Sequence, residues 1–296
     1  LLSPDAGLNL IPFAALVDEN NQYLVQNYQI TYLTSGRDLL RFKDKLPSQQ
    51  SPMIIADPIY NKEGETVALN PQPDQLRSSS LCETGFKTFN RLPQTEEEAK
   101  TVKQFFPKAT VLTKLQATEN ALKQVKRPKF LHIATHGFFC ESPATNQPER
   151  ENPLLRSGLV LAGVNLGQSA GDDGVLTALE TTSLNLVGTQ LVVLSACETG
   201  QGDITIGDGV YGLRRALVIA GSESQLISLW KVSSNATRDL MIAYYGRLTK
   251  GEGRSEALRQ TQLEMLKSET QNHPSYWAGF IPSGNWTSAD FNSFGE

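Results

Sequence analysis

Residues 190–200 have the sequence QLVVLSACETG, in which positions 191–194 are all leucine or valine. Continuous apolar runs of this length that contain β-branched residues are typical of strands buried on both faces of a parallel sheet. The run ends at Ser195, and the reactive side chain of Cys197 follows two positions later. This stretch therefore predicts a central strand with a candidate nucleophile where the strand ends.

Runs of the same kind lie on either side of this strand, with helix patterns between them. Strands are predicted at residues 53–56, 109–113, 129–135, 158–163, 190–195, 224–230 and 277–281. Helices are predicted at residues 96–106, 119–126, 210–220, 234–250 and 254–267. Strands that alternate with helices build βαβ units, in which neighbouring strands are parallel. The sequence thus predicts an α/β fold with an open, mainly parallel sheet and helices on both faces.

The first 50 residues have a different character, because their short apolar runs are broken by polar turns. They predict a hairpin or small sheet and then a short helix at 35–42. We expect a small N-terminal β/α subdomain at 1–50, packed on a main domain at 51–296, with irregular loops at 61–93 and 140–157. The chain begins with leucine and its first residues already have core character, so it is expected to be part of a longer polypeptide.

Composition excludes several classes of function. The chain has 27 basic and 31 acidic residues and a formal net charge of −4, so no nucleic-acid partner is expected. No apolar run reaches the roughly 18–20 residues that span a bilayer, so no membrane association is expected either. Its 3 cysteines have scattered spacings that predict neither a disulfide framework nor a zinc ribbon. These features favour a reducing compartment and a cytoplasmic location.

His136 and Cys197 each follow a predicted parallel strand, and the carboxyl ends of such strands meet at one edge of the sheet. A thiol attacks as the thiolate, and a nearby imidazole can take its proton. Backbone N–H groups of Gly137 and Cys197 can stabilise the developing oxyanion, and Gly137 has no Cβ to obstruct its own N–H. The pattern predicts a Cys–His dyad, for which no third, orienting side chain is marked by spacing.

Simpler interpretations of the same residues stay open at this point. A cysteine after an apolar strand is often a small buried hydrophobic residue, and a histidine at a strand end often serves a structural hydrogen bond. His132 and His136 lie about 13 Å apart along an extended strand, and no glutamate follows His132 as in zinc-binding His-Glu-x-x-His motifs. We therefore predict no metal and no other cofactor, and interpret His132 as a structural support for the loop that follows.

Residues 131–137 (LHIATHG) and 191–200 (LVVLSACETG) resemble the two catalytic blocks of the CHAT family. These proteins are caspase-like cysteine peptidases, in the same clan as separases and metacaspases; they are commonly fused to tetratricopeptide repeats (TPR), and many are bacterial. Further blocks resemble CHAT signatures in the same order, at residues 10–16, 92–97, 209–215, 228–230 and 273–278. The resemblance implies a caspase-like fold, with His136 as general base and acid, Cys197 as nucleophile, and Gly137 and Cys197 forming the oxyanion hole. It also implies that the chain is the C-terminal part of a TPR–CHAT protein.

The resemblance also suggests which residues bind substrate. In caspase-like enzymes the residue two before the cysteine lines the pocket for the side chain that precedes the cut, and here it is the small, neutral Ser195. Caspase specificity for aspartate is therefore not expected. Asp57 either forms a negative wall that favours lysine or arginine or merely ends its strand. Trp230 lies in the segment 229–232, where related peptidases present an edge strand to substrate, and is either a pocket wall or a core residue.

Taken together, these features predict a cysteine endopeptidase that cleaves a protein or peptide substrate through a thioester acyl-enzyme. A fused TPR region or a regulatory protein is the expected partner that gates the site. The main alternative is a catalytically silent caspase-like scaffold that binds protein partners. A hydrolase that acts on a non-peptide acyl group is a third option, because the chemistry is shared.

Overall fold

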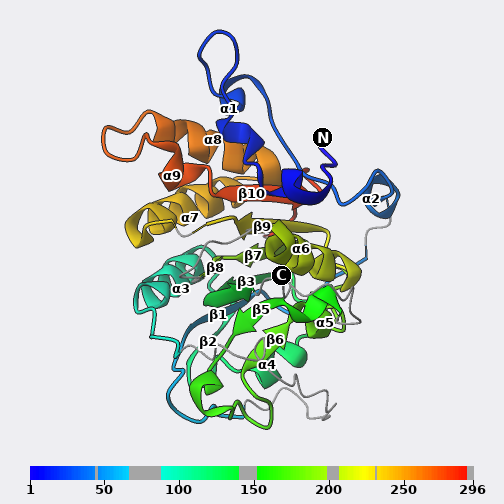
Figure 1. Ribbon diagram of the computed structural model, residues 1–296, viewed down its shortest axis with the longest axis vertical. Helices are drawn as coiled ribbons and strands as arrows, with labels where there is room; N and C mark the ends of the chain where they lie inside the picture. Colours follow the sequence, from blue (N-terminus) through cyan, green and yellow to red (C-terminus); the bar gives the residue numbers. More distant parts are fainter. Residues whose placement is uncertain (44–45, 67–87, 140–151, 199–206, 231, 292–296) are drawn as a thin grey trace, which may run out of the picture.

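A six-stranded sheet forms the centre of the computed structural model, in the order β10-β9-β7-β3-β1-β2 (Figure 1). Its strands are β1 (Met53–Pro58), β2 (Thr110–Lys114), β3 (Phe130–Ala134), β7 (Leu191–Leu194), β9 (Ser224–Ser228) and β10 (Phe280–Gly284). All neighbouring strands are parallel except β9 and β10, which are antiparallel. The prediction of a mainly parallel α/β sheet is therefore confirmed. The structure describes all residues of the chain except 44–45, 67–87, 140–151, 199–206, 231 and 292–296.

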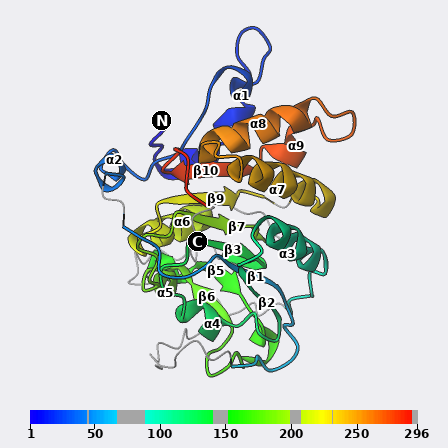
Figure 2. The same cartoon turned by 180° about the vertical axis from the view of Figure 1, so that it is seen from behind.

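Helices cover both faces of this sheet, as predicted. On one face pack α3 (Gln94–Phe105), α7 (Ser234–Leu248), α8 (Arg254–Leu266) and α9 (Pro274–Trp277). On the other face pack α4 (Glu119–Lys123), α5 (Ala178–Thr181) and α6 (Gly207–Ile219). Figure 2 shows α3 and α7 on one side of the strands and α6 on the other. Side chains alternate between the two cores, so that Ile54 belongs to the first and Ile55 to the second.

A second, four-stranded sheet continues from two central strands, in the order β6-β5-β4-β8. It consists of β4 (His136–Phe139), β5 (Ser157–Val160), β6 (Val175–Thr177) and β8 (Cys197–Glu198). Only Thr135 separates β3 from β4, and only Ser195 and Ala196 separate β7 from β8. His136 and Cys197 therefore follow their strands as expected, but each of them begins a new, short strand that the sequence did not predict.

The N-terminal segment contacts the edge of the large sheet through strand β10 (Figure 1). Its elements are two 3-10 helices (Ala6–Leu10 and Phe13–Ala15), α1 (Leu24–Asn27) and α2 (Asp38–Arg41). Tyr32 bridges to both Leu2 and Ser283, while the predicted hairpin is reduced to one bridge between Val17 and Tyr23. Single bridges do not build a ladder, so among its described residues this segment contains no sheet of its own. The division into units 1–50 and 51–296 stays a prediction.

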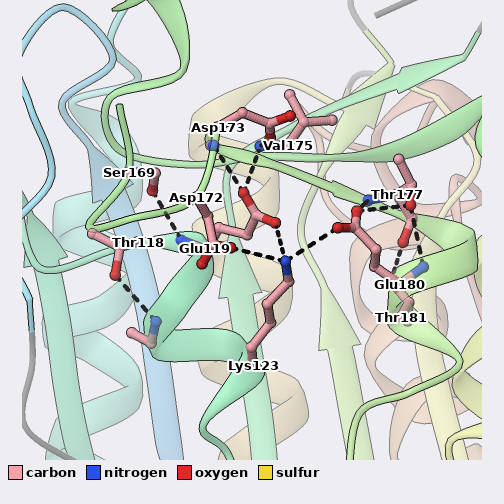
Figure 3. A network of polar contacts seen from close by, with 12 residues as sticks. Thr118, Glu119, Lys123, Ser169, Asp172, Asp173, Val175, Thr177, Glu180 and Thr181 are labelled. Atoms are coloured by element: carbon pink, nitrogen blue, oxygen red, sulfur yellow. Dashed lines mark hydrogen bonds and ion pairs between the residues drawn. The ribbon is translucent and has the colours of Figure 1, made fainter. Parts of the chain in front are cut away.

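A buried ion cluster attaches α4 to the second sheet (Figure 3). Lys123 Nζ lies 2.6 Å from Glu119 Oε1, 3.1 Å from Asp172 Oδ1 and 3.1 Å from Glu180 Oε1. The other oxygen of Glu119 accepts the backbone N–H of Val175, which begins β6. One lysine thus neutralises carboxylates from three chain segments beneath the sheet that carries His136 and Cys197.

Among the helices of the described ranges, none has both the length and the apolar character that crossing a bilayer requires.

Candidate active site

Strands β4 and β8 are parallel neighbours, and their register sets His136 opposite Cys197 and Gly137 opposite Glu198. Neighbouring strands of a sheet lie about 4.8 Å apart. The backbones of the two candidate catalytic residues therefore lie side by side, although 60 residues separate them in the sequence, among them strands β5, β6 and β7.

The His136 ring is buried between two aromatic rings, and a hydrogen bond fixes its Nε2 atom. Its centroid lies 5.5 Å from that of Tyr60 and 5.6 Å from that of Phe89. His136 Nε2 lies 2.8 Å from the backbone carbonyl oxygen of Asn90. Because a carbonyl oxygen only accepts, Nε2 carries a proton, and in the neutral ring Nδ1 keeps the basic lone pair.

Neighbouring side chains hold the residues that contact His136. The Tyr60 hydroxyl lies 2.9 Å from the Thr135 hydroxyl, which donates to the Val160 carbonyl oxygen at 2.5 Å. Burial raises the pKa of Tyr60 to about 12, so its hydroxyl remains a donor at neutral pH. On the other side, the Asn165 side chain accepts the Phe89 N–H at 2.9 Å and donates to the Phe89 carbonyl at 2.9 Å. These contacts fix the main chain that presents the Asn90 carbonyl.

Sequence reasoning missed the Asn90 carbonyl as the orienting group. Every residue has a carbonyl, so no side-chain pattern marks the one that contacts a histidine. Asn90 also lies at the end of the polar stretch 61–93, which has no periodicity to align it with His136.

Gly137 lies on β4 in ordinary extended surroundings rather than in a sterically forced position. A Cβ built on it would lie 3.6 Å from the Gly158 carbonyl oxygen and 3.9 Å from Ala196 Cβ, which are ordinary contacts. At Gly158, by contrast, a Cβ would lie 2.5 Å from the Leu176 carbonyl oxygen. Packing within the chain therefore requires glycine at position 158 but not at 137.

Of the predicted pocket residues, Asp57 and Ser195 are both engaged with other residues of the chain. Both oxygens of Asp57 bind the Arg91 guanidinium, at 2.8 Å and 2.5 Å. Ser195 is buried, and its hydroxyl donates to Glu98 Oε2 at 3.1 Å. The other Glu98 oxygen lies 3.2 Å from Nε2 of the fully buried His132. A role of Asp57 or Ser195 toward substrate stays a prediction.

The edge strand expected around Trp230 is not present among the described residues of that segment. Strand β9 ends at Ser228, and it lies inside the sheet between β7 and β10. The Leu229 N–H already donates to the Gly279 carbonyl at 2.8 Å, and Trp230 Nε1 donates to the Ser275 carbonyl at 3.1 Å. Both donors are thus already engaged within the chain, and a role of Trp230 toward substrate stays a prediction.

Among the described residues, no group of three or more histidine, cysteine, aspartate or glutamate side chains is arranged to hold a metal ion. Cys82 and Cys140 lie outside the described residues.

Comparison with known proteins gives one family and several relatives. The family model described as CHAT domain matches residues 1–285. Tetratricopeptide repeat protein 28 of Homo sapiens is 27% identical over 303 residues, which cover 96% of this chain but 12% of that protein. The same protein of Mus musculus is 25% identical over 297 residues, covering 94% of this chain and 12% of its own length. The chain therefore corresponds to a small part of these curated relatives.

Solved structures with a similar fold have low sequence identity to this chain. The Arg-specific cysteine proteinase gingipain R is 10% identical with a TM-score of 0.45, and the match covers 85% of this chain and 51% of that one. A chain of the Saccharomyces cerevisiae separase–securin complex is 13% identical with a TM-score of 0.48, covering 94% of this chain and 14% of that one.

Proposed function

The chain belongs to the CHAT domain family, and from this premise we propose that it is a cysteine endopeptidase of the caspase-like type. In this proposal Cys197 is the nucleophile and His136 is its base. The observation that supports it is the register of β4 and β8, in which His136 stands opposite Cys197. The hydrogen bond from His136 Nε2 to the Asn90 carbonyl adds support, because it leaves Nδ1 as the basic nitrogen.

The proposed reaction has two halves. First, His136 Nδ1 takes the thiol proton, the sulfur forms a bond to the peptide carbonyl carbon, and the backbone N–H groups of Gly137 and Cys197 stabilise the oxyanion. The C–N bond then breaks, Nδ1 returns its proton to the leaving amine, and a thioester remains. In the second half Nδ1 takes a proton from water, the hydroxide displaces the sulfur, and the thiol is restored. The Asn90 carbonyl stabilises the imidazolium whenever His136 holds the extra proton.

A thiol-labelling experiment tests this proposal without a known substrate. Near pH 7, iodoacetamide is expected to alkylate Cys197 roughly tenfold faster than Cys82 or Cys140, because a neighbouring imidazole raises the thiolate fraction. The advantage should disappear in His136→Ala. As a matched control, His273→Ala removes an exposed histidine that caps α9 and should leave the rate unchanged. Mass spectrometry of the labelled peptides gives the three rates, and equal rates at Cys197 with and without His136 would contradict the dyad.

Gly137 offers a separate test of the oxyanion hole. Gly137→Ala is expected to lower kcat/KM by about tenfold to a hundredfold, because a methyl group would intrude where the oxyanion binds. The thermal stability should not fall, since the Cβ would make only ordinary contacts. Gly158→Ala is the contrasting variant, and it should lose stability because its Cβ would clash with a backbone carbonyl. Unchanged kcat/KM in Gly137→Ala would remove this glycine from the proposed hole.

We also propose that the partners of the chain are proteins, namely a peptide substrate and a TPR region. The support is that the curated relatives are tetratricopeptide repeat proteins. The bacterial source and the cytoplasmic location stay predictions, and the relatives named above are mammalian.

A catalytically silent scaffold is the second candidate function. The observation that favours it is that the N-terminal segment exposes several large apolar side chains, which mark a binding site where they form one contiguous patch. They are Leu1, Leu8, Leu16, Val17, Tyr28, Leu39, Leu40 and Leu46. The labelling experiment separates the two candidates, since a scaffold gains nothing from an activated thiol.

A further inference from the structure

Asp57 is a charged side chain held without exposure at the carboxyl end of β1. Its exposed fraction is 0%, and its φ of 51° lies in the left-handed region that few residues other than glycine adopt. Its backbone N–H donates to the Thr95 hydroxyl at 3.0 Å. Burying a carboxylate is unfavourable unless it is paired. The fold therefore maintains a preformed anionic position that requires a cation.

Arg91 supplies that cation from the surface. Its Nε lies 2.8 Å from Asp57 Oδ1 and its Nη2 lies 2.5 Å from Oδ2, so a single guanidinium binds both oxygens side by side. Nη2 also contacts Glu96 Oε2 at 3.1 Å. The Arg91 side chain remains 42% exposed while that of Asp57 is 0% exposed. Arg91 thus covers the carboxylate, and its own outer surface faces solvent.

The Asp57–Arg91 pair lies directly beside the candidate dyad. Ala56 pairs with Ala134 in the register of β1 and β3, so Asp57, the next residue of β1, lies at the same end of the sheet as His136, two residues after Ala134. Arg91 comes directly after Asn90, whose carbonyl accepts the His136 Nε2 proton. A peptide bound for cleavage between His136 and Cys197 would therefore pass close to this ion pair.

We propose that Asp57 forms a guanidinium-binding subsite that Arg91 occupies from within, and that Arg91 thereby determines which substrate side chain the site accepts. Two guanidinium groups cannot both bind the same pair of oxygens side by side. An arginine of a substrate would have to displace Arg91, and one ion pair would replace another without net gain. The chain with Arg91 in place therefore has little preference for a basic side chain, and removal of Arg91 creates one. This inference rests on the proposed peptidase function for its substrate, but its binding step can be measured without any cleavage.

The first experiment measures binding of methylguanidinium to the Arg91→Ala variant of the 296-residue chain. The Kd of methylguanidinium, measured by chemical-shift titration, is expected to be at least about tenfold lower for Arg91→Ala than for the wild type. Methylurea, which has a similar shape and no charge, should bind neither protein. The double variant Asp57→Asn/Arg91→Ala is the matched control and should not bind methylguanidinium. Equal affinity of all three proteins would overturn the proposal.

A second variant guards against loss of folding in Arg91→Ala. Arg91→Met keeps most of the aliphatic stem over Asp57 and removes only the charged group. It should also bind methylguanidinium more tightly than the wild type. If the Met variant is folded and shows wild-type affinity, the proposal fails.

The last experiment connects the subsite to cleavage. Peptides with arginine or citrulline before the cut differ in charge and hardly in shape. The ratio of kcat/KM for arginine over citrulline is expected to rise at least about tenfold in Arg91→Ala. An unchanged ratio would overturn the assignment of specificity to Arg91. Absence of cleavage in every variant would instead count against the peptidase function, while the methylguanidinium titration still decides the subsite.

Discussion

Replacement of Cys197 by alanine is expected to lower kcat/KM for peptide cleavage by about 10⁴-fold to 10⁶-fold. Loss of the attacking group removes the covalent route, and nucleophile removal in enzymes of this kind has effects of that order. Cys82→Ala and Cys140→Ala should retain wild-type activity. A proteome-wide cleavage profile that compares wild type with Cys197→Ala would measure the loss and identify the substrates together. Equal cleavage by the two proteins would refute the proposed mechanism.

The same loss is expected for His136, but its replacement needs a stability control. The ring fills a space between Tyr60 and Phe89, so His136→Ala would leave a cavity there. His136→Asn keeps more of the volume and still lacks a base that titrates near neutral pH. Loss of activity in His136→Asn with an unchanged melting temperature would separate a catalytic role from a packing role.

Replacement of Lys123 by methionine is expected to lower the free energy of unfolding by about 3–5 kcal/mol. The variant would leave Glu119, Asp172 and Glu180 without their shared cation, and removing one partner of a buried ion pair has an effect of this size. Urea denaturation at pH 7 measures it. Lys100→Met is the matched control, because Lys100 is 67% exposed and its pair with Glu96 lies at the surface, where an ion pair contributes little to stability.

The pH dependence gives this prediction a second measurement. Burial already raises the pKa of Glu119 to about 8 although Lys123 opposes the shift, and Lys123→Met should raise it further because that opposition is lost. A raised carboxyl pKa stabilises the folded state at low pH and loses that contribution as pH increases. Because both pKa values of Glu119 lie above 7, the difference from wild type should grow as the pH is raised from 7 to 9. A loss below about 1 kcal/mol at pH 7 would show that the cluster has little effect on stability.

The central strands were predictable because strands that are buried on both faces of a sheet have continuous apolar sequences. Residues 53–56 and 191–194 contain only apolar residues, and both stretches are buried in β1 and β7. Their alternate side chains enter two different cores, as Val192 and Val193 do. Short apolar runs of this kind are typical of strands that are buried on both faces of a parallel sheet.

The second sheet was not predictable from local sequence. Strand β8 has 2 residues and β4 has 4. Strand β4 pairs with both β5 and β8, and β8 pairs with β4, so both strands depend on partners far away in the sequence. No periodicity can be detected over such lengths. The prediction therefore identified His136 and Cys197 by chemistry and by their order after strands, and it missed the strands that align them.

The last strand of the large sheet begins later in the sequence than predicted. The predicted strand at 277–281 is found as β10 at Phe280–Gly284, because a short helix precedes it. Pro274 occupies the first turn of α9, and the His273 side chain accepts the Ser275 N–H at its start. Trp277 is fully buried in that helix, so its apolar character reflected core packing and not a strand.

The two connections between the sheets make the site far more sensitive to chain length than to residue type. Thr135 alone joins β3 to β4, and Ser195 and Ala196 join β7 to β8. Adding or deleting one residue in either connection would shift the register of β4 and β8 by one, so that a neighbour of Cys197 would pair with His136. Because successive residues of a strand face opposite sides of the sheet, position 197 would then face the other side. Among descendants of one ancestral gene, codon insertions and deletions at these two joints would therefore be removed by selection even where point substitutions at Thr135 or Ala196 are retained.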